Sequence, residues 1–74
     1  MPDKILIIDD EKDLSDVLKK YLTLKGYSVT IAYNGKDGIA EAKKGDYSII
    51  VADIQLPDIN GVEVIRAIEK VDSK

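Results

Sequence analysis

In the stretch KILIIDD, residues 4–10, an apolar run ends abruptly in Asp9 and Asp10, and this pattern indicates the class of fold. A short, continuous apolar run rich in β-branched residues is typical of a strand buried on both faces of a parallel sheet. The same arrangement recurs in SIIVAD, residues 48–53, where the run ends in Asp53. The sequence therefore predicts two strands, each of which delivers aspartate at its carboxyl end.

The segments between these two strands predict a helix, an edge strand and a second helix. One apolar stripe repeats at helical spacing along the first of them and contains Leu14, Val17, Leu18, Tyr21 and Leu22. Gly26 fits the C-terminal cap of that helix. Residues 27–33 alternate in polarity, which indicates a half-buried edge strand. A turn at residues 34–35 then leads into a weaker helix, with apolar residues at 39, 40 and 42 and Gly45 at its close.

The loop DIQLPDING, residues 53–61, leads into a last helix over residues 62–71. Asn60 and Glu63 have the spacing of a capping box at its start. Its expected buried stripe contains Val64, Ile65, Ile68 and Val71. The order strand, helix, strand, helix, strand, helix places the chain in the α/β class, with parallel strands joined by right-handed crossovers.

Composition limits the chemistry that this chain can perform. A chain of 74 residues forms one domain at most, and its 45% apolar and 34% charged residues suit a globular fold. It has no cysteine and no histidine, which excludes disulfides, thiol chemistry and an imidazole base. A net charge of −3 argues against a nucleic-acid-binding surface. The first residues do not resemble a signal peptide and no apolar run is long enough for a membrane span, so a cytoplasmic protein is expected.

The carboxyl ends of neighbouring parallel strands meet at one edge of a sheet, where α/β proteins bind their ligands. If the first and third strands are neighbours, Asp9, Asp10 and Asp53 lie within a few ångströms of one another. Like charges at that distance repel, and either protons or a cation must relieve the repulsion. Mg²⁺ fits best, because it prefers hard oxygen ligands. The glycines of a nucleotide-binding loop are missing from DDEKD, residues 9–13, so a phosphate cradle is not expected there.

A plainer interpretation competes for each acid. Asp10 or its neighbours can serve only as a helix N-cap and first-turn acids, a common use of aspartate. Asp58, between Pro57 and Asn60, is expected to be a solvated turn residue without a chemical role. The ligand-site interpretation rests on the two strands ending in acid, since capping one helix needs a single short polar residue.

Taken together, KILIIDDEKD, VADIQLPDING and the helix over residues 62–71 resemble the receiver domain of two-component response regulators, the CheY-like family. The most specific matches are Asp9 with Asp10, Asp53, Pro57 and Gly61. The resemblance implies a flavodoxin-like, three-layer fold with strand order 2-1-3 in this βαβαβα chain. It also implies that Asp53 accepts a phosphoryl group from a histidine kinase. Mg²⁺ would be bound by Asp10, Asp53 and the backbone carbonyl of Gln55, with Asp9 assisting. Such a domain is a phospho-acceptor and not an enzyme, with at most weak self-phosphorylation from small phosphodonors.

The resemblance covers only the N-terminal half of a receiver domain. A full receiver continues with two more strands and two more helices, so residues 1–74 are expected to be its N-terminal part. The hydroxyl residue that ends strand four and the lysine that ends strand five are then absent, and phosphotransfer is expected to be impaired. The alternative is a half-domain that folds by self-association without phosphotransfer. Its third strand would pair with a second copy in a homodimer of order 2-1-3-3'-1'-2'. An unrelated acidic metal-binding domain is a weaker alternative, because it leaves Pro57 and Gly61 unexplained.

Overall fold

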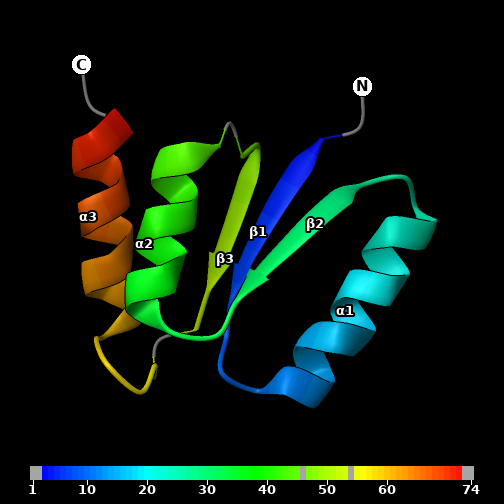
Figure 1. The fold of residues 1–74 in the computed structure, drawn as a ribbon, viewed down its shortest axis with the longest axis horizontal. Helices are drawn as coiled ribbons and strands as arrows, with labels where there is room; N and C mark the ends of the chain where they lie inside the picture. Colours follow the sequence, from blue (N-terminus) through cyan, green and yellow to red (C-terminus); the bar gives the residue numbers. More distant parts are fainter. Residues whose placement is uncertain (1–2, 46, 54, 73–74) are drawn as a thin grey trace.

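A computed structural model describes the backbone of residues 3–45, 47–53 and 55–72, and side chains as far as Ile68. The elements in chain order are β1 (Lys4–Ile8), α1 (Lys12–Leu24), β2 (Ser28–Ala32), α2 (Gly35–Lys44), β3 (Ile49–Ala52) and α3 (Gly61–Asp72). The three strands are parallel and lie in the order β2-β1-β3 (Figure 1). The predicted α/β class, element order and strand order are confirmed.

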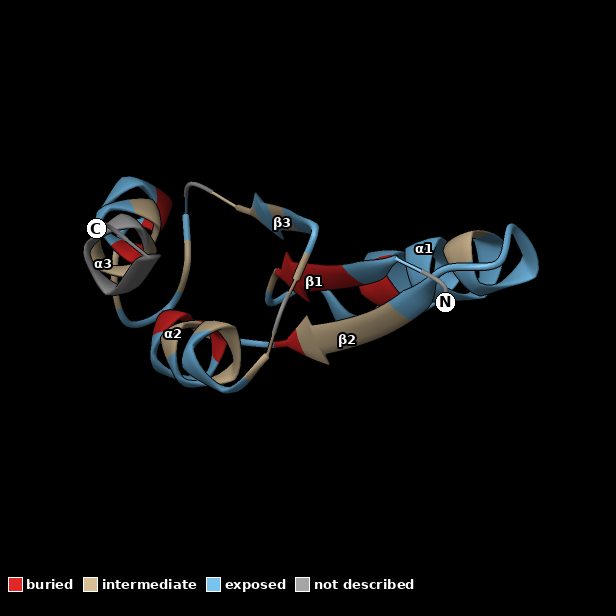
Figure 2. Cartoon of the chain, turned by 90° about the horizontal axis from the view of Figure 1, so that it is seen from above, coloured by how far each residue is buried: buried red, intermediate tan, exposed pale blue. Residues whose placement is uncertain are grey.

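The helices divide between the two faces of the sheet. Seen from above in Figure 2, α2 and α3 lie on one side of the strands and α1 lies on the other. The register opposes Ile5 to Ile49 and Ile7 to Val51, so these side chains share the face that carries α1. Leu6 and Ile8 point to the opposite face. Residues 5–8 are all buried, which confirms that β1 is covered on both faces.

The core lies between the sheet and the helices α2 and α3. Its fully buried members are Leu6, Ile8, Ala32 and Val64. Helix α2 approaches β1 closely, because a Cβ atom built on Gly38 would come within 2.5, 2.8 and 2.9 Å of three Ile8 side-chain atoms. Of the apolar residues that marked this helix in the sequence, Ile39 and Ala42 are partly buried and Ala40 is exposed, whereas Gly35 and Gly38 are buried. Only glycine fits at position 38, where the backbone of α2 lies against the Ile8 side chain.

Helix α1 forms as predicted, but its buried face differs from the predicted stripe. Ser15 is fully buried, whereas Val17 is 63% and Tyr21 is 57% exposed. The helical spacing placed the apolar residues on one side correctly, but that side is turned partly away from the sheet. The Ser15 hydroxyl is buried without a hydrogen-bond partner among the described residues. Gly26, just beyond the helix, has a φ of 99° and so supplies the left-handed residue expected of a C-terminal cap.

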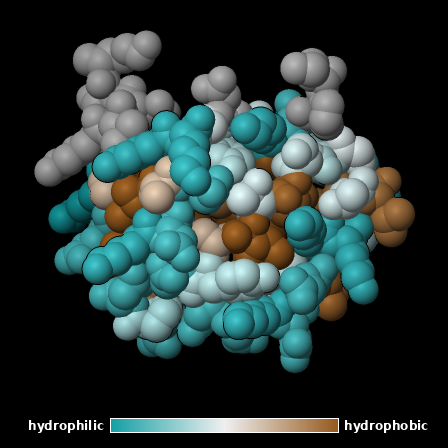
Figure 3. Space-filling model, viewed as in Figure 1, coloured by the Kyte–Doolittle hydropathy of each residue, from teal (hydrophilic) through white to brown (hydrophobic). Residues whose placement is uncertain are grey.

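The two outer strands are less buried than β1. The central residues of β2 are half-buried, as predicted for an edge strand. In β3, Ile49 and Val51 are about half exposed, at 49% and 51%, so this strand is covered on one face only. Apolar surface is visible between hydrophilic regions in the space-filling view of Figure 3. The described part of the sheet therefore leaves apolar side chains accessible to solvent.

Helix α3 begins at Gly61, but the predicted capping box is wrong in detail. The Asn60 side-chain oxygen accepts a hydrogen bond from the Val62 N–H at 2.7 Å, and not from Glu63. Val64 is fully buried and Ile65 and Ile68 are partly buried, as the predicted stripe requires. The side chain of Val71, also assigned to that stripe, lies outside the described residues.

Candidate functional site

The candidate site lies at the carboxyl edge of the sheet, where backbone hydrogen bonds join the three strand ends. The Asp9 N–H donates to the carbonyl of Ala32 at the end of β2, at 3.0 Å. The Asp53 N–H donates to the carbonyl of Ile8 at the end of β1, at 2.9 Å. The sheet ladder thus continues one residue past each strand and fixes the backbone of Asp9 and Asp53 relative to each other.

Three carboxylates meet at this edge. One oxygen from each of Asp9, Asp10 and Asp53 lies within 4.8 Å of the others. Asp9 and Asp53 are half-buried and Asp10 is exposed, so the cluster is open to solvent. Oxygens on opposite sides of an octahedral Mg²⁺ are about 4.2 Å apart. The donor atoms and their spread therefore suit Mg²⁺ after a small adjustment of the side chains.

Two of these acids also make local hydrogen bonds. The Asp9 Oδ1 atom accepts from the Glu11 N–H at 2.9 Å, just ahead of α1. The Asp53 Oδ1 atom accepts from the Gln55 N–H at 3.3 Å. No hydrogen bond to the Asp10 carboxylate is found among the described residues. Glu11 is the N-cap residue of α1 and makes no capping bond with its side chain. The capping alternative therefore applies to Asp9 in part and not to Asp10.

The loop after β3 carries the predicted fourth ligand, the carbonyl of Gln55. Gln55 pairs with Asn60 in an isolated antiparallel bridge, which folds residues 55–60 back on themselves. Gln55 itself is exposed. The loop is thus a short, closed turn beside the acids, and metal binding by the Gln55 carbonyl stays a prediction.

Asp58 is the residue in this region whose structural role the sequence interpretation missed. Its Oδ1 atom accepts from the N–H groups of Gly35 at 2.7 Å and Ile59 at 3.0 Å, and its Oδ2 atom accepts from Lys36 at 2.9 Å. These bonds, led by the one from Gly35, hold the pKa of Asp58 below its ordinary value of 3.8. Asp58 therefore caps α2 from a loop more than twenty residues later in the chain. The turn pattern of PDIN, residues 57–60, does not reveal such a distant partner.

A second polar cluster lies near Lys4, at the amino-terminal end of β1. The Tyr47 hydroxyl donates to Glu41 Oε1 at 3.0 Å, which lowers the pKa of the Glu41 carboxyl. The Lys44 ammonium lies 3.4 Å from Glu41, and Lys4 lies over the Tyr47 ring at 4.9 Å from its centre. Because Lys4 sits at the end of β1 opposite Asp9, this cluster is separate from the acidic site. It joins the end of α2 to the segment that leads into β3.

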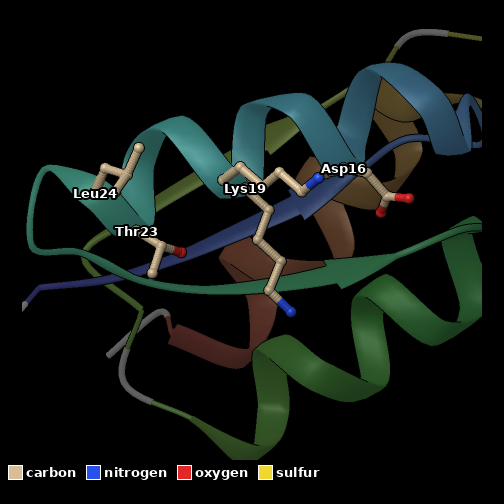
Figure 4. Close-up of a pocket in the computed structure, with 5 residues that line it drawn as sticks. Asp16, Lys19, Thr23 and Leu24 are labelled. Carbon is tan, nitrogen blue, oxygen red and sulfur yellow. The ribbon is translucent and has the colours of Figure 1, made fainter.

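A shallow pocket of about 590 Å³ lies along α1. It is lined by Asp16, Lys19, Lys20, Thr23 and Leu24. Figure 4 shows these side chains on the helix, with Asp16, Lys19, Thr23 and Leu24 labelled. All the lining residues come from one exposed helix, and none belongs to the acidic cluster. None of the helices in the part of the chain that the structure describes has the length and apolar character needed to cross a bilayer.

Comparison with known proteins assigns the chain to a family. The family model of the response regulator receiver domain matches residues 5–74. The chain is 44% identical over 70 residues to the uncharacterized transcriptional regulatory protein YkoG of Bacillus subtilis. That match covers 95% of this chain and 31% of YkoG. The chain therefore belongs to the response regulator receiver family, and the predicted resemblance is confirmed.

Solved structures of receiver domains have the same fold as this chain. The CheY-like receiver domain protein from Methanospirillum hungatei superposes with a TM-score of 0.93 at 32% identity, over 96% of this chain and 57% of that one. The response regulator TrrA of Thermotoga maritima, in complex with Mg²⁺-BeF, gives a TM-score of 0.86 at 35% identity, over 92% of this chain and 59% of TrrA. TrrA has also been solved in complex with the histidine kinase ThkA. The chain thus spans less than two thirds of the length of these solved relatives.

Proposed function

We propose that this chain is the phospho-accepting part of a receiver domain, with Asp53 as the acceptor. The observation that carries the proposal is the cluster of Asp9, Asp10 and Asp53 at the carboxyl edge of the sheet, within 4.8 Å of one another. Asp53 is anchored by its backbone to β1 and is only half-buried, so a phosphodonor can reach it. Asp10 is the most solvent-exposed of the three acids and makes no competing hydrogen bond among the described residues. We assign it, with Asp53 and the Gln55 carbonyl, to the binding of Mg²⁺, and Asp9 to an assisting role.

The proposed reaction moves one phosphoryl group. A carboxylate oxygen of Asp53 uses its electron pair to form a bond to phosphorus. The bond from phosphorus to the donor breaks, and its electron pair leaves with the donor, an imidazole nitrogen of a histidine kinase or the carboxylate of a small acyl phosphate. Bound Mg²⁺ would neutralise the charge that collects on the carboxylate and phosphoryl oxygens. The chain contributes the acceptor and the acidic ligands, and the family's lysine and hydroxyl residue are not matched here. We therefore expect slow transfer.

The direct test is the mass of the chain after incubation with Mg²⁺ and acetyl phosphate. We expect a mass increase of one phosphoryl group in part of the sample, because the acceptor and the acidic ligands are present. Asp53→Asn should show no increase, since an amide cannot form the acyl phosphate. The product should also disappear at alkaline pH, as an acyl phosphate hydrolyses there.

The controls separate this function from its alternative. Asp16→Asn makes the same change of residue on the exposed face of α1 and should keep the mass increase. An equal increase in Asp53→Asn would place the phosphoryl group elsewhere. No increase in the unaltered chain would favour the alternative, a half-domain that folds without phosphotransfer.

The cellular setting follows from the same proposal. A histidine kinase or phosphotransfer protein is the proposed donor, in agreement with the TrrA complex named above. We place the chain in the cytoplasm and propose no contact with nucleic acid, given its net charge of −3. The chain would act as a phospho-acceptor and not as an enzyme that turns over a substrate.

We also propose that the free chain forms a homodimer through β3. In the described part of the sheet β3 pairs with β1 alone, and its residue Val51 is 51% exposed. An unpaired edge with apolar side chains favours association.

Sedimentation should show an apparent mass that rises with protein concentration, and Val51→Lys should shift the chain toward monomer. Val62→Lys changes a residue of equal exposure, 51%, on α3 and should not. A folded monomer at all concentrations would contradict the dimer.

A further inference from the structure

The bonds made by Asp58 join two segments that both border the acidic cluster. Helix α2 begins three residues after the last residue of β2, and the loop over residues 55–60 begins two residues after Asp53. Asp58 spans 23 residues of sequence to accept from Gly35 and 22 to accept from Lys36. It also accepts from the N–H of its neighbour Ile59. The carboxylate therefore ties the tip of the loop to the first turn of α2.

The first turn of α2 is fully hydrogen-bonded because of this tie. The first four N–H groups of a helix have no partner within it. Here Asp58 accepts from Gly35 and Lys36, and the Asn34 side chain accepts from Asp37 at 2.8 Å. Gly38 then makes the first regular bond of the helix, to the Asn34 carbonyl at 3.0 Å. Two residues therefore cap α2 together: Asn34 at the start of the helix and Asp58 in the loop beside the acids.

Side-chain packing also holds the loop tip against the start of α2. Gly35 is buried, and a Cβ atom built on it would clash with the Ile59 side chain. Ile59 is partly buried against the core. The loop tip therefore rests directly on the backbone of the helix start, where only glycine leaves room.

We propose that Asp58 is a positioning residue for the metal site: by fixing the loop tip to α2, it holds the Gln55 carbonyl beside the acidic cluster. The inference rests on the proposed Mg²⁺ site. The bridge from Gln55 to Asn60 closes the loop but does not fix where the closed loop points. The Asp58 bonds to α2 fix that direction, together with the packing of Ile59 on Gly35 and the hydrogen bond from the Gln55 N–H to Asp53. Without them the loop must be ordered when the metal binds, and that ordering weakens affinity.

The experiment compares Mg²⁺ affinity and stability across variants of the 74-residue chain. Asp58→Ala should weaken Mg²⁺ binding about tenfold, as loss of an outer-shell partner does. Asn34→Ala is the matched control, because it removes the other half of the same helix cap without touching the loop. It should lower the urea midpoint comparably and leave Mg²⁺ affinity within about twofold. In NMR spectra, Asp58→Ala should shift the amide protons of Gly35 and Lys36, whereas Asn34→Ala should shift that of Asp37.

A third variant separates hydrogen bonding from charge. Asp58→Asn removes the negative charge but keeps an oxygen that accepts from Gly35 and Ile59, so it should recover most of the affinity lost in Asp58→Ala. Equal losses in both Asp58 variants would assign the effect to charge and overturn the proposal. Equal losses of Mg²⁺ affinity in Asp58→Ala and Asn34→Ala would assign the effect to helix stability and would also overturn the proposal. If the unaltered chain binds no Mg²⁺, the proposed site itself fails, a result distinct from either of these.

Discussion

Replacing Asp10 by asparagine is expected to lower Mg²⁺ affinity about 30-fold or more while making the metal-free chain more stable. At 4 Å in water, one unit charge attracts a divalent ion by about 2 kcal/mol, which corresponds to that factor. Asp10 makes no hydrogen bond among the described residues, so the substitution removes charge without breaking a cap. Its repulsion with Asp9 persists in the unfolded chain, because the two are adjacent. The repulsion with Asp53 arises only on folding, and its relief should add about 1 kcal/mol of stability at low salt.

Calorimetry or NMR titration measures the Mg²⁺ affinity of Asp10→Asn, since the chain has no tryptophan for fluorescence. Urea unfolding in the presence of a chelator measures the stability of the metal-free chain. Asp16→Asn is the matched control: it makes the same change of charge on the exposed face of α1 and should alter neither quantity appreciably. An Asp10→Asn variant that binds Mg²⁺ as tightly as the unaltered chain would exclude Asp10 as a ligand.

Replacing Gly38 by valine is expected to cost about 3 kcal/mol of the free energy of unfolding. A Cβ at this position meets three atoms of Ile8, which is fully buried in the central strand and cannot move aside. The new side chain must push α2 away from β1, and that displacement loosens the core around Leu6 and Val64. A chain of 74 residues has a total stability of about 4 to 11 kcal/mol, so the loss takes a large share of it.

The matched control is Ala40→Val, which adds a β-branched residue to the exposed side of the same helix. Its cost should stay within about 0.7 kcal/mol, the range of helix propensity. Urea midpoints of the two variants, measured at one protein concentration, give the comparison. Equal destabilisation would mean that helix propensity, and not contact with Ile8, sets the requirement for glycine at position 38.

Much of this fold could be predicted from local patterns. Buried strands, such as β1, are marked by their apolar runs, and the ends of those runs placed Asp9, Asp10 and Asp53 at one edge of the sheet. Parallel strands bring their carboxyl ends together whatever the details of packing, so the acidic cluster follows once β1 and β3 are neighbours. The residue pattern that resembles the receiver family supplied the strand order, which periodicity alone leaves open.

Other features depend on contacts between distant segments. Periodicity shows that α1 has an apolar side, but the angle at which α1 meets the sheet decided that Ser15 is buried and Val17 is exposed. Periodicity also marked Ala40 as an apolar residue of α2, but Ala40 is exposed and Gly38 is the residue that lies against Ile8.

The same distinction holds at the candidate site: the acidic cluster could be predicted from local patterns, whereas the contact of the neighbouring loop with α2 could not. The identity of the clustered acids could be predicted from the sequence, because strand direction places them at one edge of the sheet. The capping of α2 by Asp58 is visible only in the folded chain, since no local pattern relates Asp58 to Gly35 across so many residues.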